Sequence, residues 1–159
     1  EERQLTTTEQ MKDEICAALG GRAAESLFFD KVSTGALSDL EKVTKQAYAM
    51  VSIYGLSPKL GNISYYDSSG QNSGFTKPYS EERAKLIDSE VSKLIEEQYN
   101  RALKVLRDNK KKVEELANAL LSNEVIFKDN LVSIFGARKW TSYHEEKLEE
   151  EESKTKKKK

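Results

Sequence analysis

The sequence predicts a mainly α-helical protein, a bundle of about five helices with a small β element near residues 62–77. Three observations support this fold class. Apolar residues recur at intervals of three and four over most of the chain, which places them on one face of an α-helix. Capping signals precede several of these stretches. Only one short stretch, 62–66, has the aromatic and β-branched composition of a strand.

The first helix is expected to begin near Thr7, because Thr6 and Glu9 have the spacing of a capping box. Its apolar face carries Met11, Ile15, Ala18 and Leu19. The pair Gly20-Gly21 weakens the helix by about 1 kcal/mol per glycine relative to alanine, yet helical composition resumes over 22–28. Adjacent glycines inside a helix usually allow another element to approach closely. We therefore expect such an approach here.

A second helix is expected after Ser38, which has capping-box spacing with Glu41, and it should end near Gly55. An exposed loop, 67–74, follows the strand-like segment. Ser80 is then the expected N-cap of a long helix that runs to about Arg107. Two shorter helices complete the pattern, the first with apolar residues at 113–121 and the second ending before Gly136.

Composition limits the function classes. Lys plus Arg number 26 against 27 Asp plus Glu, so no global field attracts nucleic acid. The single cysteine, Cys16, cannot form an internal disulfide, which indicates a reducing compartment and a small buried apolar residue. No apolar run approaches the ~20 residues that span a bilayer. The chain starts without Met on a polar stretch, and we expect it to be cut from a longer protein.

Residues 141–159 form an acidic run followed by a basic one, with too little apolar content to fold, so a disordered charged tail is expected. The single histidine, His144, lies at the edge of this tail and is assigned no catalytic or ligand role. Phosphate-binding loops, nucleophile elbows and clustered Cys/His motifs are absent from the sequence. By motif alone, no enzyme is visible.

Two acidic residues are candidates for a site. Asp39 falls in the first turn of the second helix, where a carboxylate is stabilised by about 0.3–1 kcal/mol through the helix dipole. That structural role alone accounts for most first-turn acidic residues. Glu25 has an equally ordinary interpretation as a solvated helix residue.

Three motifs favour a functional interpretation of these residues: LGGRAAE at 19–25, STGALSDL at 33–40 and YGLSPKLG at 54–61. Their order and spacing, with KPYSE at 77–81 before a long helix, resemble the M41 peptidases, the FtsH and mitochondrial AAA protease group. The resemblance covers about residues 1–140, which would be the C-terminal portion of the peptidase domain. Only the charged tail is unmatched.

The resemblance implies a zinc site. In the family, a His-Glu-x-x-His helix supplies two zinc ligands and the general base, and the aspartate that matches Asp39 supplies the third ligand. Glu25 would orient a metal-bound imidazole. No His-Glu-x-x-His occurs in these 159 residues, so the chain by itself has no catalytic residue and is expected to be inactive.

The resemblance also implies the setting of the parent protein: a membrane-anchored, ATP-dependent zinc endopeptidase that degrades misfolded or unassembled proteins. It would form a homo-hexamer, with ATP bound in a separate AAA module and membrane contact through upstream segments only. The expected location is the bacterial inner membrane, facing the cytoplasm, or alternatively the mitochondrial inner membrane. Two other hypotheses stay open: a non-catalytic helical interaction module, and an adaptor that binds lipid or nucleic acid through Lys156–Lys159.

Overall fold

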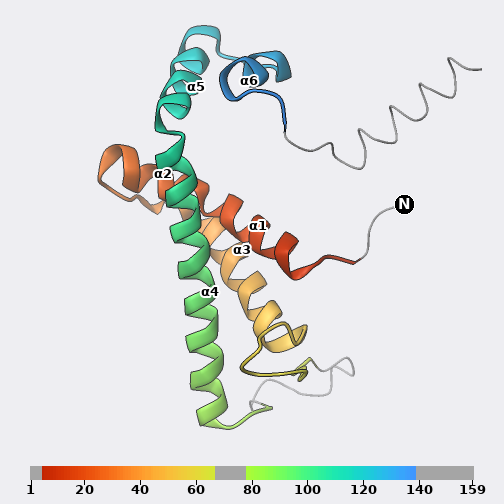
Figure 1. Cartoon of the computed structure of the whole chain (residues 1–159). Helices are drawn as coiled ribbons and strands as arrows, with labels where there is room; N and C mark the ends of the chain where they lie inside the picture. The colour runs from red at the N-terminus through yellow and green to blue at the C-terminus, as the bar shows by residue number, and fades with distance from the viewer. Residues whose placement is uncertain (1–4, 67–77, 139–159) are drawn as a thin grey trace, which may run out of the picture. The chain divides into compact units, whose positions relative to one another are not determined.

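The computed structural model describes residues 5–66 and 78–138. Contacts divide the chain into two units, residues 1–108 and 109–159, which are described separately. Unit 1 contains α1 (Thr8–Ala18), α2 (Gly20–Phe29), the 3₁₀ turn η1 (Thr34–Ala36), α3 (Leu37–Tyr48), the π-helix η2 (Ala49–Ile53) and α4 (Glu81–Asp108). Unit 2 contains α5 (Lys110–Asn123) and α6 (Lys128–Phe135) (Figure 1). The described residues contain no strand, and the mainly α prediction is confirmed.

The long helix α4 organises unit 1. It packs one face against α1, α2 and α3 (Figure 1). The largest of the almost completely buried side chains there are Ile15, Leu19, Val43 and Ile87. The predicted N-cap of α4 is confirmed, because the Ser80 hydroxyl accepts a hydrogen bond from the Arg83 amide at 3.2 Å. The amphipathic stripe seen in the sequence is thus the face that α4 presents to the core.

The start of α1 differs by one residue from the prediction. Thr7, and not Thr6, is the N-cap: its hydroxyl accepts from the Gln10 amide at 3.2 Å, and the Gln10 side chain accepts from the Thr7 amide at 2.9 Å. Thr7 has the extended backbone that an N-cap requires, with φ −79° and ψ 162°. Glutamine completes the capping box as well as glutamate does.

The two glycines after Leu19 mark a break between helices. The Leu19 amide donates to the Ile15 carbonyl, and the Leu19 carbonyl accepts from Ala23, so Leu19 belongs to both helical ladders. The prediction that another element approaches these glycines closely is wrong for the described residues. A Cβ added at Gly20 or Gly21 meets none of their atoms within 4 Å. These glycines allow the chain to bend at the surface while Leu19 stays in the core.

The second predicted helix also begins earlier than expected. Helix α3 begins at Leu37, and its N-cap, Ala36, forms no side-chain capping bond. Ser33 instead caps the preceding turn η1, where its hydroxyl accepts from the Gly35 amide at 3.2 Å. The expected cap, Ser38, lies inside the helix. The 3₁₀ turn leads directly into α3, so the side-chain cap lies at the start of this turn and not at the start of the helix.

The small β element expected near 62–77 is not formed over 62–66, and 67–77 lie outside the described residues. One backbone hydrogen bond joins the segment 62–66 to the π-helix, from the Tyr65 amide to the Ser52 carbonyl at 2.8 Å, and a local one runs from the Ile63 amide to the Gly61 carbonyl at 2.9 Å. Tyr65 packs edge-on against Tyr79, with ring centroids 4.9 Å apart. One such bond does not make a ladder, and no described segment offers an edge for a second strand.

In unit 2, helices α5 and α6 occupy the two stretches that the sequence predicted, and they contact each other. Neither helix contains a buried residue. The expected tail, 141–159, lies outside the described residues. Cys16 is only half-buried, although the sequence predicted burial, and partial burial raises the pKa of its thiol. Across 5–66 and 78–138, no helix has both the length and the apolar composition needed to cross a membrane.

Candidate metal-ligand site at the start of helix α3

The candidate site lies where the chain turns back after α2. Asp30 ends this helix in the left-handed conformation, with φ 52°, and the chain then reverses into the turn Ser33–Ala36. The reversal brings this turn beside α2, where Ser33 contacts Arg22 and Glu25. The first two sequence motifs are therefore neighbours in space, which their spacing alone did not establish.

A carboxylate on α2 holds this turn. Glu25 accepts two hydrogen bonds from Ser33, at 2.5 Å from the hydroxyl and 3.2 Å from the amide. Arg22 lies one helical turn earlier and donates to the Ser33 carbonyl at 2.9 Å, with its guanidinium 3.8 Å from the Glu25 carboxylate. Ser33 is therefore bound at its amide, its hydroxyl and its carbonyl, and the turn is fixed to α2.

The same contacts lower the pKa of Glu25. The Ser33 hydroxyl makes the largest contribution to this lower pKa, followed by the Ser33 amide. Desolvation opposes them, and nearby Arg22 adds a smaller lowering effect. A carboxyl whose pKa is lowered on folding stabilises the fold above its unfolded pKa, and this stabilisation is lost as pH falls through the folded pKa. The bracing of the turn is therefore complete at neutral pH and fails in acid.

Replacing Ser33 by Ala is expected to raise the pKa of Glu25 toward its ordinary value, because it removes the largest cause of the shift. A carboxyl-carbon NMR titration of both proteins would measure this change. Glu41 is a matched control, since its own lowered pKa comes from Lys45 and should stay constant in Ser33→Ala. An unchanged Glu25 titration would contradict the assigned contacts.

Asp39 lies in the first turn of α3, directly after this braced turn. Its side chain is exposed, and it forms no hydrogen bond or ion pair with the rest of the described chain. The neighbouring Leu37 is 72% exposed. The Asp39 carboxylate is thus free to bind a metal ion, and it lies near the largely exposed side chain of Leu37.

The described residues offer one candidate metal ligand at this place, Asp39, and not a complete site. No cluster of three His, Cys, Asp or Glu side chains with metal-binding geometry occurs in the described parts of the chain. Both oxygens of Glu25 already accept a hydrogen bond from Ser33. An exposed, unpartnered carboxylate on a fixed helix start suits the role of a single protein ligand to zinc.

The structure also identifies residues that the sequence interpretation missed. Ser33 and Arg22 connect the two motifs, although neither was singled out. A signal for Ser33 existed, because a serine two residues before a glycine is a common side-chain turn. The partner Glu25 lies eight residues away and could be found only from the chain reversal. The third motif, 54–61, lies elsewhere in unit 1, where Ser57 and Lys59 contact Glu90 of α4.

Comparison with known proteins gives consistent matches. The sequence model of peptidase family M41 matches residues 1–134. The ATP-dependent zinc metalloprotease FtsH of Parabacteroides distasonis is 60% identical over 152 residues, which are 96% of this chain and 22% of that protein. The mitochondrial ATP-dependent zinc metalloprotease FTSH 3 of Arabidopsis thaliana is 43% identical over 141 residues, 89% of this chain and 17% of that protein.

A mammalian relative shows the same partial coverage. The mitochondrial inner membrane m-AAA protease component AFG3L1 of Mus musculus is 43% identical over 137 residues, which are 86% of this chain and 17% of that protein. The chain thus spans about a fifth of the length of the curated relatives it matches.

Proposed function

Because this chain belongs to peptidase family M41, as its three motifs indicated, we propose that it is the C-terminal part of the peptidase domain of an ATP-dependent zinc endopeptidase. Residues 1–140 would form this part, and Asp39 would be a zinc ligand. The observation that carries the proposal is the Asp39 carboxylate, which is exposed and has no partner in the described chain at the start of a helix. Its motif is the one that the resemblance connects with the metal.

Neighbouring parts of this chain would hold the Asp39 carboxylate in place. The positive end of α3 favours a carboxylate in the first turn, and the contacts of Ser33 with α2 fix the turn that precedes it. We infer that Glu25 acts by holding this turn, because its two oxygens are already bound there. When bound, zinc would activate a water molecule for attack on a peptide bond. The two remaining protein ligands and the general base would come from outside these 159 residues.

The proposal also covers the longer protein of which this chain would be a part. Its substrates would be unfolded, misfolded or unassembled proteins, and ATP would bind in a separate AAA module. Six copies would enclose a proteolytic chamber. The membrane anchor would lie in upstream segments, with the bacterial inner membrane as the expected location and the mitochondrial inner membrane as the alternative.

A second candidate function is a non-catalytic helical interaction module derived from such a peptidase. The observation that favours it is in unit 2, where α5 and α6 bury no side chain. Large apolar side chains are open to solvent there, including Leu121 at 84% and Phe127 at 70% exposure. Exposed apolar patches of this kind mark surfaces that bind another protein.

Zinc content and casein hydrolysis would separate the two candidates. We expect the 159-residue chain alone to bind less than one equivalent of zinc and to leave casein intact, because one carboxylate holds zinc poorly. The full-length protein encoded by the same gene should bind one zinc per chain and hydrolyse casein with ATP. A full-length protein without zinc or hydrolysis would favour the interaction module.

A further inference from the structure

The segment that carries Asp39 has little contact with the core. Of residues 31–39, only Ala36 is buried, and the first turn of α3, which contains Asp39, is exposed. Helix α3 first places a fully buried side chain in the core at Val43. Packing therefore fixes the middle of α3 more firmly than its first turn. The position of the Asp39 carboxylate then depends on what holds the turn that precedes the helix.

Two side chains of α2 hold this turn through the backbone of Ser33. Ser33 is extended, with φ −113° and ψ 176°, so its amide and its carbonyl point to the same side, as they do in a β-strand. Arg22 and Glu25 are three residues apart and therefore share a face of α2. Glu25 accepts from the Ser33 amide at 3.2 Å, and Arg22 donates to the Ser33 carbonyl at 2.9 Å. Helix α2 thus supplies an acceptor and a donor to one residue.

Arg22 is the donor of this pair. Its Nη1 atom binds the Ser33 carbonyl and also lies 3.8 Å from a Glu25 oxygen, so one nitrogen contacts both the turn and the carboxylate that holds it. Glu25 cannot replace this contact, because an ionised carboxylate has no proton to donate. The Arg22 side chain is 21% exposed, so most of its aliphatic stem is covered and its guanidinium has limited freedom to move.

We propose that Arg22 is a positioning residue for the Asp39 carboxylate, which acts through Ser33 and raises the affinity of this place for zinc. The inference rests on the proposed role of Asp39 as a zinc ligand. A ligand has to be held within about 0.5 Å of its binding position. The apparent affinity of a site falls with the fraction of molecules that are in the binding conformation. By holding the turn, Arg22 increases that fraction.

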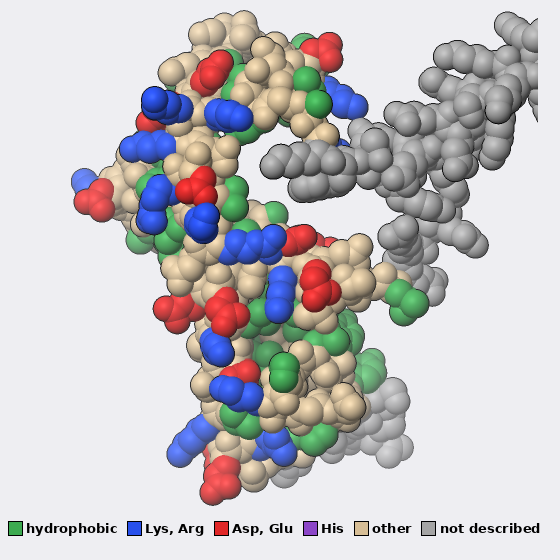
Figure 2. Space-filling model, viewed as in Figure 1, with side chains coloured by type: hydrophobic (Ala, Val, Ile, Leu, Met, Phe, Trp, Pro, Cys, Tyr) green, Lys and Arg blue, Asp and Glu red, His purple; other side chains and the backbone are tan. Residues whose placement is uncertain are grey.

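The direction of the effect separates positioning from simple electrostatics. A cation near a metal site repels zinc, so removal of Arg22 would raise the zinc affinity if only its charge mattered. Removal of its hydrogen bond would lower the affinity, because the turn is released. Lys and Arg side chains are interspersed with Asp and Glu side chains on the face shown in Figure 2. Removal of one charge without a positioning role should therefore change zinc binding little.

Arg22→Met tests the inference, because methionine keeps an unbranched stem and lacks the donor. In the full-length protein, we expect zinc binding to weaken at least about tenfold, as for other residues that support metal ligands. Competition with a chelator measures this affinity. Arg22→Lys keeps a donor and the charge and should restore most of it. The urea midpoint should stay the same in both variants, because the contacts with Ser33 are exposed.

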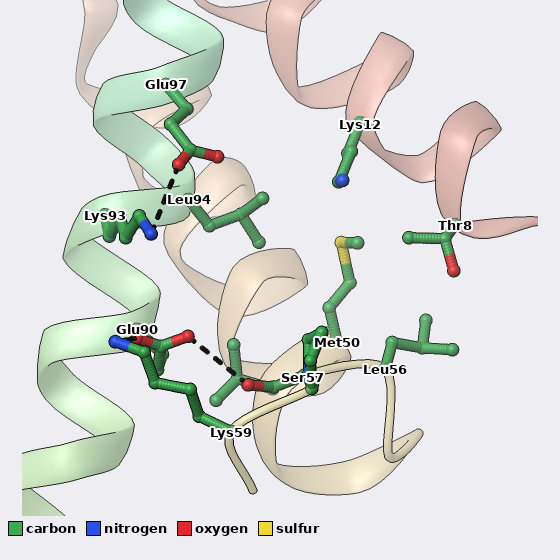
Figure 3. Close-up of a pocket in the computed structure, with 12 residues that line it drawn as sticks. Thr8, Lys12, Met50, Leu56, Ser57, Lys59, Glu90, Lys93, Leu94 and Glu97 are labelled. Atoms are coloured by element: carbon green, nitrogen blue, oxygen red, sulfur yellow. Dashed lines mark hydrogen bonds and ion pairs between the residues drawn. The ribbon is translucent and has the colours of Figure 1, made fainter. Parts of the chain in front are cut away.

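Two lysines provide matched controls by the same substitution. Lys31 is exposed, lies two residues before Ser33 and forms no hydrogen bond or ion pair with the described residues. Lys12 lines a cleft of about 310 Å³ between α1, η2 and α4, to which residues 22–39 do not contribute (Figure 3). Lys31→Met and Lys12→Met each remove one cation without releasing the turn. Neither should weaken zinc binding.

A second measurement needs no metal. In the 159-residue chain, ¹⁵N relaxation gives the order parameters of the backbone amides, which report motion on the picosecond to nanosecond timescale. We expect Arg22→Met to lower the order parameters of residues 33–39, because the turn loses its contact at the Ser33 carbonyl. Lys31→Met should leave them unchanged.

Three results would overturn the inference: zinc affinity in Arg22→Met equal to or above that of the unmodified protein, equal weakening by Lys31→Met, or unchanged order parameters over 33–39 in Arg22→Met. The proposed function is decided separately by Asp39→Ala. Weaker zinc binding in Asp39→Ala but not in Arg22→Met would keep the ligand and reject the positioning role. Unchanged binding in both would reject Asp39 as a ligand, and with it the effect of Arg22 on zinc.

Discussion

Asp39→Ala in the full-length protein is expected to abolish zinc-dependent casein hydrolysis, with a loss of at least about a hundredfold. Changes to residues that only support metal ligands already cost 10–100-fold, and this change removes a proposed ligand. Zinc retained after dialysis should fall in parallel. Both quantities can be measured on the same purified protein.

The position of Asp39 makes this experiment easy to interpret. Its side chain is exposed and has no partner among the described residues, so its removal affects stability only through the helix dipole, about 0.3–1 kcal/mol. Glu41→Gln is the matched control, because it removes a second exposed carboxylate of α3, whose ion pair with Lys45 is exposed on both sides. The control should keep its zinc and activity. Full activity in Asp39→Ala would remove this residue from the metal site.

The helices could be predicted because their signal is repeated along the chain. The apolar stripe of α4 recurs over many turns, and one misjudged position does not change its period. The cap positions are different. Three consecutive threonines, 6–8, stand where α1 begins, and Thr7 becomes the cap because its backbone is extended and Gln10 completes the box. Composition cannot choose among neighbours with the same side chain, so a one-residue error follows.

Residues 62–66 were misread as a strand for a similar reason. Their aromatic and β-branched composition favours an extended backbone, and strand propensity measures fit to a partly buried surface more than an intrinsic preference. The surface that Tyr65 finds is Tyr79 and the backbone of the π-helix, not a neighbouring strand. The π-helix itself, in which the Tyr54 amide reaches the Ala49 carbonyl at 2.9 Å, had no sequence signal that we recognised.

The candidate site was predictable only in part. Asp39 was expected in a first turn, and the structure places it there. The contacts that fix this turn depend on a left-handed residue, Asp30, which redirects the chain so that Ser33 meets Glu25. A non-glycine residue in that conformation is uncommon and could not be anticipated from the sequence. The ligand candidate thus came from a local pattern, whereas its support came from tertiary structure.

Ile15→Ala should destabilise unit 1 strongly, by about 2–5 kcal/mol. Ile15 is 0% exposed and lies in the core between α1, α3 and α4. The truncation removes buried methyl groups and leaves a cavity that the surrounding helices fill only partly. Because small domains are stable by about 5–15 kcal/mol, the variant should unfold at a much lower urea concentration, as followed by circular dichroism at 222 nm, a wavelength that reports helix content.

Leu37→Ala is the control for Ile15→Ala, because it also shortens an aliphatic side chain but at an exposed position. Leu37 is 72% exposed and outside the core cluster, so its truncation in the 159-residue chain should change the free energy of unfolding by no more than about 0.5 kcal/mol. Equal losses in the two variants would mean that Ile15 is not in a packed core. If Leu37→Ala instead became destabilising only in the full-length protein, Leu37 would be covered there by a segment outside this chain. The covering segment would then lie beside Asp39, where the proposed site needs its remaining ligands.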